Sequence, residues 1–484
     1  MVYSNILHAL GWLILVIAVA MVVPLIFAFG TADAKAFSAF SLSFLFTLFS
    51  GGALIMAFRD TGASLTKRDL LPFVAAGWTV MSFFGALPFF TIHPDASFTG
   101  AVFESVSGIT TTGATVFETL DDKSRALILW RAILEWLGGW GSVFLGAAVF
   151  ASFGIGGMSL RLSPLTRGET TNPLQRLRST ATEIGRIYTT LTLVGLLVVW
   201  ASGVPAFDAI CLTLSAVSTG GFVPTDAGLS AYEGIAPKFW LMVLMCLGAI
   251  SFATHRQVVR TGLRAVREDP EVLYFFNLVL AASLVIWFVT LIAAPGHGDI
   301  FSTLFAVISL VSTTGWLPHE AAWIERTSPV LLLGLAVIGG STLSTAGGLK
   351  LLRAGLLVKQ SGKELQRLVY PHGIIQSRFG DRTFGIQLMK SVWAFFVVFV
   401  TALGFGGIVF AAMGIDMEPA FAAALSLLAN VGPAYDMARL AGMDGPSIHD
   451  FSTLAKWWGI IIMLAGRLEL VLVLALTNRA FWRG

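Results

Sequence analysis

The chain has 484 residues, of which 56% are hydrophobic and only 12% are charged. A soluble globular protein carries about 25% charged residues, so this composition excludes a soluble enzyme or binding domain and predicts a protein embedded in the lipid bilayer. The formal net charge of +3 is too small to indicate nucleic acid as a partner.

Ten apolar stretches are long enough to cross a bilayer, because a hydrocarbon core about 30 Å thick needs about 20 helical residues. We therefore expect an all-α integral membrane protein. The first two stretches form an extra N-terminal helix pair, near residues 6–29 and 38–58. The other eight are expected near 70–90, 126–154, 187–203, 239–254, 272–294, 329–358, 384–413 and 452–478.

Four shorter apolar stretches alternate with these spans. They are too short to cross the bilayer, so we expect re-entrant half-helices that enter and leave on the same side. The order span, half-helix, loop, span then recurs four times, which predicts four pseudo-repeats around a central pore. The half-helices are expected near 97–110, 206–218, 300–312 and 418–430.

One short pattern, a Ser, five residues and a Gly, marks the end of each half-helix. Its glycines are spaced by 108, 94 and 117 residues. Four copies in register with the hydropathy pattern indicate loops that converge on one axis, as in an ion selectivity filter; the alternative is a set of small-residue packing contacts between helices. Glycine adopts positive φ freely, so backbone carbonyls can face the axis and replace the hydration shell of a monovalent cation. The predicted filter residues are Thr111, Thr112, Gly113, Thr219, Gly220, Gly221, Thr313, Thr314, Gly315, Asn430, Val431 and Gly432.

A run of small and polar residues interrupts the predicted span at 329–358. A helix broken inside the membrane exposes backbone groups that need protein or water as partners. The loop at 339–350 is therefore expected either to plug a pore below the filter or to be a glycine kink for close packing. The candidate gate residues in this loop are Gly339, Gly340, Ser341, Thr342, Ser344, Thr345, Gly347 and Gly348.

Charged residues inside the predicted spans are candidates for a role in transport. A charge at the bilayer centre costs roughly 2.5–3.5 kcal/mol on insertion scales, so it usually faces an interior or a water path. Arg467 in the last span is therefore expected to face a protein interior or a water path, the alternative being an ion pair with an acid. Glu469 is only two residues away and points to a different helix face, so a direct bond between the two is not expected. Structural pairing is favoured for Glu104, Arg131, Glu135 and Asp208.

Basic residues cluster in the loops after the second span of each of the first three repeats, within 161–186, 256–267 and 350–367. The loops after the filters are richer in acids. By the positive-inside rule the basic loops are cytoplasmic, both termini lie on that side, and the filters open outward. The basic loops are also a candidate docking face for a soluble regulator, and the outer acids would raise the local cation concentration.

Several sequence stretches resemble the TrkH/KtrB superfamily of potassium-transport subunits, in particular the TrkH branch with its extra N-terminal helix pair. The resemblance implies a homodimer in the bacterial inner membrane that binds potassium ion and a cytosolic nucleotide-binding regulatory subunit of TrkA type. It also implies that the loop at 339–350 gates the pore, with Arg467 as an electrostatic barrier below the filter. The fourth repeat departs from the pattern, because Asn430 and Val431 replace the hydroxyl pair. The stretches are Phe103–Gly113, Glu135–Gly141, Ser218–Phe222, Arg267–Glu271, Gly339–Lys350, Asn430–Pro433 and Gly466–Glu469.

A secondary transporter of a small organic solute, built from broken helices, is the alternative function. Four parallel copies argue against it, because such transporters usually contain two inverted halves. An enzyme is not expected, since the sequence lacks the His-Glu-x-x-His and Gly-x-Ser-x-Gly patterns. The expected organisation is an N-terminal hairpin at 1–60, repeat 1 at 61–160, repeat 2 with a basic linker at 161–268, repeat 3 at 269–368 and repeat 4 at 369–484.

Overall fold

The structure is a computed structural model. It describes residues 2–59, 67–92, 97–147, 173–293, 299–318, 323–370, 378–379, 382–383 and 386–470. These residues are predominantly helical, as the sequence predicts. One short antiparallel pair joins β1 (Arg378–Phe379) to β2 (Arg382–Thr383).

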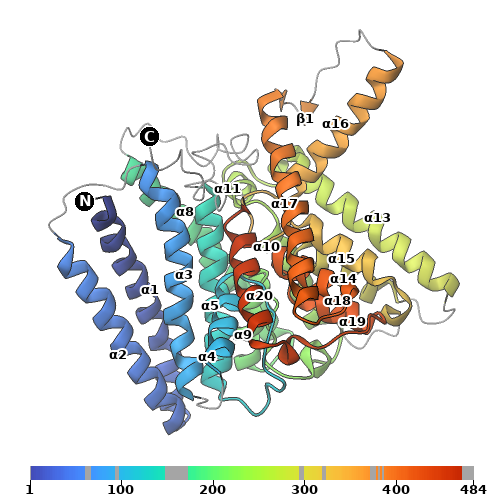
Figure 1. The fold of residues 1–484 in the computed structure, drawn as a ribbon. Coiled ribbons are helices and arrows are strands. Elements are labelled where there is room, and N and C mark those ends of the chain that lie inside the picture. Colours follow the sequence, from blue (N-terminus) through green and yellow to red (C-terminus); the bar gives the residue numbers. More distant parts are fainter. Residues whose placement is uncertain are drawn as a thin grey trace.

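Three long helices form one edge of the molecule: α1 (Val2–Gly30), α2 (Ala34–Ala57) and α3 (Lys67–Ile92) (Figure 1). The turn between the first two is fixed by Asp33, whose carboxylate accepts a hydrogen bond from the backbone N–H of Ala36 at 2.9 Å. Large apolar side chains such as Phe49 and Met56 are more than 70% exposed on the outer face. Such a surface is stable in lipid rather than in water.

Six described helices are long and apolar enough to cross a bilayer: α1, α2, α3, α8 (Pro173–Ala201), α13 (Pro270–Ala293) and α17 (Ile386–Ala412). A seventh candidate consists of α10 (Ile235–Ala249) and α11 (Phe252–Thr261), which meet at a bend of 99°. The sequence predicts a single span there, so this break is a difference from expectation. Three other predicted spans contain α5 (Arg125–Leu145), α15 (Pro329–Ile338) and α20 (Thr453–Arg467), of which α15 ends at the loop at 339–350.

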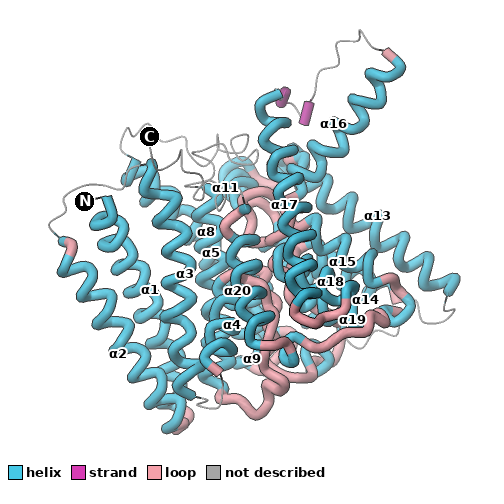
Figure 2. The backbone as a smooth tube through the Cα atoms, viewed as in Figure 1, coloured by secondary structure: helices cyan, strands magenta, loops and turns pink. Residues whose placement is uncertain are grey.

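Four short helices lie inside this framework, close to the bounds predicted for the half-helices. They are α4 (Phe98–Ile109), α9 (Ala206–Ser218), α14 (Ile300–Val311) and α18 (Met417–Leu428). Each is largely buried and leads into a loop that runs through the middle of the molecule (Figure 2). Short helices on one side of these loops are η4 (Gly228–Ala231), η5 (Ile324–Arg326), α19 (Pro433–Leu440) and η6 (Ile448–Asp450).

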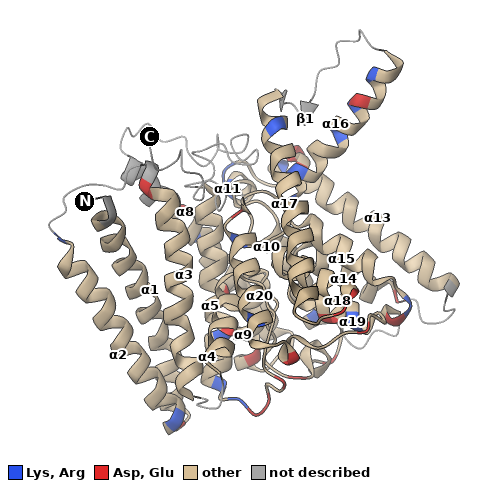
Figure 3. Cartoon of the chain, in the orientation of Figure 1, with Lys and Arg blue, Asp and Glu red and all other residues tan. Residues whose placement is uncertain are grey.

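One helix leaves the compact body. After α15 ends, the chain runs as a loop to α16 (Leu351–Val369), whose far end projects outward (Figure 1). Acidic residues concentrate in the loops at the opposite end of the molecule (Figure 3). The remaining helix, α12 (Arg264–Glu268), links α11 to α13.

Candidate functional site

The four short helices α4, α9, α14 and α18, termed pore helices after their predicted role, end in the same hydrogen-bonded turn. In the first, the N–H of Thr111 binds the carbonyl of Gly108, and the N–H of Thr112 binds the carbonyl of Ser107, both at 2.8 Å. This pair of bonds defines a Schellman motif, in which the residue after the helix has positive φ. The same two bonds recur in the other three repeats. The left-handed residues are Thr111, Thr219, Thr313 and Asn430, with φ between 52° and 65°.

The serine of the Ser-x5-Gly pattern clamps each loop to its own pore helix. The Ser107 hydroxyl donates to the carbonyl of Ala114 at 2.6 Å, and that of Ser426 donates to the carbonyl of Val431 at 2.7 Å. Ser215 accepts from the N–H of Gly221 at 3.0 Å, and Ser309 accepts from the N–H of Trp316. Sequence reasoning identified this serine as part of the pattern but assigned it no role.

The four loops close into a ring in chain order. A Cβ on Gly113 would overlap the backbone of Gly220, and one on Gly221 would overlap the carbonyl of Thr314. In the same way a Cβ on Gly315 would lie 2.9 Å from Pro433. The loop of Gly432 completes the ring, because its N–H binds the carbonyl of Thr112. The glycines therefore permit the closest approach of neighbouring loops.

The fourth glycine differs from the other three in its backbone. Gly113, Gly221 and Gly315 have φ of 75°, 103° and 81°. Gly432 has φ of −50° and ψ of −50°, because α19 begins directly after it. The expectation that each glycine is needed for positive φ is therefore wrong at Gly432. Lack of space is the reason for glycine there, since a Cβ would overlap the backbone of Ala114.

The loop at 339–350 lies against the loops that are predicted to form the filter, which are termed the filter loops. The backbone N–H of Gly347 donates to the Thr313 hydroxyl at 2.8 Å, and the Thr345 hydroxyl lies 3.2 Å from that of Thr219. The N–H of Gly348 binds the carbonyl of Ala429 at 2.9 Å. Three of the four filter loops therefore contact this segment through its polar groups.

The same segment supplies partners for the break between α10 and α11. The Ser341 N–H donates to the carbonyl of Ala249 at 2.8 Å, and the Phe252 N–H donates to the carbonyl of Leu343 at 3.0 Å. From the other side, buried Glu271 accepts from the Thr342 N–H at 2.9 Å. Backbone groups exposed by two broken helices thus satisfy one another inside the protein.

Arg467 reaches this loop from the end of α20. One of its guanidinium nitrogens donates to the carbonyl of Thr345 at 2.8 Å. Glu469 does not pair with it but forms an ion pair with Arg353 of α16, whose guanidinium lies 3.8 Å from the Phe395 ring centre. The expected absence of an Arg467–Glu469 bond agrees with this arrangement.

The space on the two sides of the ring differs greatly. A cavity of about 1050 Å³ is lined by Gly113, Gly221 and Gly315 and by residues of the loops that follow them. Below the ring, a cavity of only about 40 Å³ is lined by Leu343, Asn430, Arg467 and their neighbours. The ring therefore borders a large cavity on one side, whereas the space on the side of the 339–350 loop is small.

The predicted residues thus gather in two adjacent layers. Residues 111–113, 219–221, 313–315 and 430–432 form the ring, and residues 339–348 with Arg467 form the layer against it. A helical bundle in which four re-entrant helices present matched loops to one centre has the architecture of a membrane ion-transport protein.

Comparison with known proteins defines the family. The chain belongs to the TrkH family, described as cation transport protein, which it matches over residues 36–480. It is 32% identical to the Trk system potassium uptake protein TrkH of Escherichia coli (strain K12), over 99% of each chain. It is 33% identical to the protein of the same name from Halomonas elongata, again over 99% of each chain. The family resemblance seen in the sequence is confirmed.

The fold is shared with a solved relative. The crystal structure of the potassium transporter TrkH from Vibrio parahaemolyticus matches with a TM-score of 0.90 and 30% sequence identity, covering 100% of both chains. This likeness confirms the predicted all-helical membrane fold. The family transports cations across a membrane, and the chain is a transport protein rather than an enzyme.

Proposed function

We propose that this protein carries potassium across the bacterial inner membrane into the cell, through a pore lined by the four filter loops. The closed ring of loops, each held at the end of a buried half-helix, is the observation that carries the proposal. The relatives named as potassium uptake proteins support potassium as the transported ion. The alternative of a solute transporter with two inverted halves is not favoured, because the Schellman turn and the serine clamp recur four times.

The proposed filter is made of residues 111–113, 219–221, 313–315 and 430–432. Each pore helix directs its C-terminal end, which carries partial negative charge, at the loops. A cation that has lost its water would be stabilised there by backbone and hydroxyl oxygens. Because the serine clamps and the inter-loop contacts fix these oxygens before the ion arrives, little reorganisation is needed on binding.

The direct test is ion flux into proteoliposomes that contain the purified protein. We expect uptake of potassium and its congener rubidium that exceeds uptake of sodium, and no competition by organic solutes. Electrogenic uptake of an organic solute without rubidium flux would instead support the alternative. Empty liposomes and liposomes with heat-denatured protein provide the baseline.

We propose that the loop at 339–350 and Arg467 together close the pore below the filter. The hydrogen bonds from this loop to Thr219, Thr313 and Ala429 support a plug at that position. A fixed positive charge 4 Å from a cation adds a barrier of about 4 kcal/mol at an effective dielectric constant of about 20. Deletion of 341–346, or Arg467→Ala, should raise basal rubidium flux; wild-type or lower flux in folded variants would leave the loop as a packing kink.

We propose that a cytosolic nucleotide-binding regulator of TrkA type docks on the basic cytoplasmic loops, and that both termini lie on that side. Arg161 and Arg167, and the side chains of Arg176 and Arg178, lie outside the described residues. Among described residues, α16 presents Lys359, Lys363 and Arg367 on the projecting segment. Charge reversal at Arg176 and Arg178 should reduce co-purification of the regulator, and unchanged regulation would exclude that docking point.

We propose a homodimer, with the projecting α16 in contact with the second copy. Apolar side chains on this helix, including Val358, Leu365 and Leu368, are between 65% and 79% exposed. Their burial against a second copy would recover roughly 25 cal/mol per Å². Leu365→Glu with Leu368→Glu should shift the detergent-solubilised protein toward monomer in native mass spectrometry.

The proposed units remain the hairpin at 1–60 and the repeats at 61–160, 161–268, 269–368 and 369–484.

A further inference from the structure

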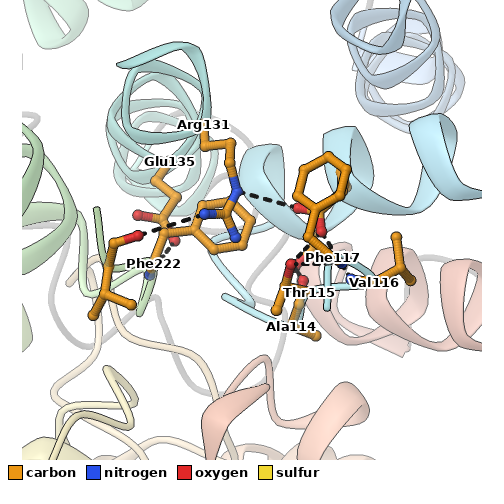
Figure 4. Close-up of polar contacts among 10 residues, drawn as sticks. Ala114, Thr115, Val116, Phe117, Arg131, Glu135 and Phe222 are labelled. Atoms are coloured by element: carbon orange, nitrogen blue, oxygen red, sulfur yellow. Dashed lines mark hydrogen bonds and ion pairs between the residues drawn. The ribbon is translucent and has the colours of Figure 1, made fainter. Parts of the chain in front are cut away.

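Three charged residues that are not part of the proposed filter lie directly behind its first two loops. Glu104 is on pore helix α4, and Arg131 and Glu135 are one turn apart on α5. All three residues are at most 1% exposed. Residues four apart on a helix share a face, so α5 presents Arg131 and Glu135 together toward the loops (Figure 4).

Glu104 binds the chain that follows the first filter. One carboxylate oxygen accepts the hydroxyl hydrogen bond of Thr115 and the backbone N–H of Val116 at 2.8 Å. The other oxygen lies 3.3 Å from Nε of Arg131. Loop 1 is thereby held to α5 through a buried ion pair.

Arg131 and Glu135 hold the second filter from the same helix. The Arg131 guanidinium lies 3.9 Å from the ring centre of Phe222, the residue directly after Gly221. Glu135 accepts the backbone N–H of Phe222 at 2.9 Å. Its carboxylate also fills the space where a Cβ of Gly220 would lie.

These contacts form one continuous connection from loop 1 to loop 2 across α5. The other loops are joined by uncharged groups: the Trp316 indole donates to the carbonyl of Gly221 at 2.7 Å, and the Asn430 amide donates to the Thr112 hydroxyl at 3.0 Å. Charged hydrogen bonds in a buried site are strong and directional. Removal of one partner leaves the other unpaired in a low-dielectric interior.

We propose that Glu104, Arg131 and Glu135 are positioning residues that set the spacing of filter loops 1 and 2, and thereby the discrimination of potassium from sodium. The inference rests on the proposed potassium filter. Selection between two monovalent cations depends on how a set of oxygens is arranged and how strongly it is held. A change in the separation of two of four loops therefore alters selectivity before it stops conduction.

Arg131 also borders the outer cavity. Substitutions of the two members of the ion pair should therefore have different effects on the KM for rubidium. Glu104→Gln leaves the guanidinium unbalanced beside the path of the incoming cation, so the KM for rubidium rises. Arg131→Gln removes that positive charge and does not raise the KM. Both variants lose selectivity, because each breaks the link between the loops.

The experiment measures rubidium and sodium uptake in proteoliposomes with wild type, Glu104→Gln, Arg131→Gln, Glu135→Gln and the double variant Glu104→Gln/Arg131→Gln. We expect the rubidium-to-sodium ratio to fall about tenfold in either single variant of the ion pair, which corresponds to about 1.4 kcal/mol. The double variant should lose little more than the singles, since either single substitution already breaks the ion pair that links the two loops. Glu135→Gln, which keeps an acceptor oxygen for Phe222, should lose less.

Asp33→Asn is the matched control. Asp33 accepts a backbone N–H and, at 2.7 Å, the hydroxyl of Ser124 at the start of α5, so it resembles Glu104 in its bonds but lies away from the filter. The Asp33→Asn variant should have lower thermal stability than wild type but the same rubidium-to-sodium uptake ratio. An unchanged ratio in folded Glu104→Gln and Arg131→Gln, or an equal loss in Asp33→Asn, would overturn the assignment.

Two provisions keep the outcomes distinct. If Glu104→Gln does not fold, Arg131→Lys replaces it, because lysine keeps the charge but cannot reproduce the contacts of Nε and the planar guanidinium with Glu104 and Phe222; an unchanged ratio in that variant then counts against the proposal. If wild type itself fails to discriminate between the two cations, the proposed potassium filter fails and the positioning role fails with it. Discrimination in wild type and in all variants removes the positioning role alone.

Discussion

The first three filter loops and the fourth use the same turn but need their glycine for different reasons. In loops 1 to 3 the glycine has positive φ and also touches the next loop. In loop 4, Gly432 has helical backbone angles and is required only by its contact with Ala114. A shared sequence pattern therefore contains two physical constraints, conformational freedom and close approach, which substitutions can separate.

Gly221→Ala should have the largest effect of the substitutions in this comparison. It places a Cβ on a residue with φ of 103° and into the carbonyl of Thr314. Backbone strain and overlap together should destabilise the ion-binding arrangement of the loops by about 3 kcal/mol. We therefore expect the potassium-to-sodium uptake ratio to fall about 100-fold. Competitive uptake in proteoliposomes measures it, and a ratio within a factor of two of wild type would contradict the ring geometry.

Gly432→Ala separates the two constraints. Alanine tolerates φ of −50°, so only the overlap with the Ala114 backbone remains. We expect a smaller fall in the uptake ratio, about tenfold. If Gly432→Ala were as damaging as Gly221→Ala in the same assay, close approach alone would explain all four glycines.

The serine clamps test whether the loops also differ in how they are held. Ser309→Ala leaves the buried N–H of Trp316 without its acceptor, whereas Ser426→Ala removes a donor from carbonyl oxygens that tolerate the loss better. We expect the free energy of unfolding to fall by about 2 kcal/mol in Ser309→Ala and by about 1 kcal/mol in Ser426→Ala. Thermal unfolding in detergent ranks them, and the reverse order would assign the clamps a different role.

Thr111→Gly should have the smallest effect on stability, and it should stabilise the protein rather than destabilise it. Thr111 has φ of 52°, and its buried hydroxyl has no hydrogen-bond partner among the described residues. Relief of left-handed strain should stabilise the protein by up to about 1 kcal/mol. The matched variant Thr313→Gly loses the hydroxyl that accepts from Gly347, so it should not be stabilised. Equal melting temperatures of the Thr111→Gly and Thr313→Gly variants would show that the contact between Thr313 and Gly347 contributes nothing to stability.

Local patterns in the chain were sufficient to predict the four short buried helices and the loops that the structure brings together after them. Half-helices predicted near 206–218 and 300–312 are observed at Ala206–Ser218 and Ile300–Val311. Their length, too short for a bilayer, and the Ser-x5-Gly pattern at their ends are properties of sequence alone. The break at 339–350 was also visible, because small polar residues interrupt an apolar run.

Other features depend on partners distant in the sequence. The break between α10 and α11 carries no proline, and its freed backbone groups are satisfied by Ser341 and Leu343 some 90 residues later. The helical backbone of Gly432 is set by α19. The pairing of Glu469 with Arg353 rather than Arg467 is set by how α16 meets the residues that follow α20. Periodicity and composition determine which segments are helical and which lie in the membrane. Only tertiary packing decides which buried polar groups meet, because their energies depend on partners that no local pattern specifies.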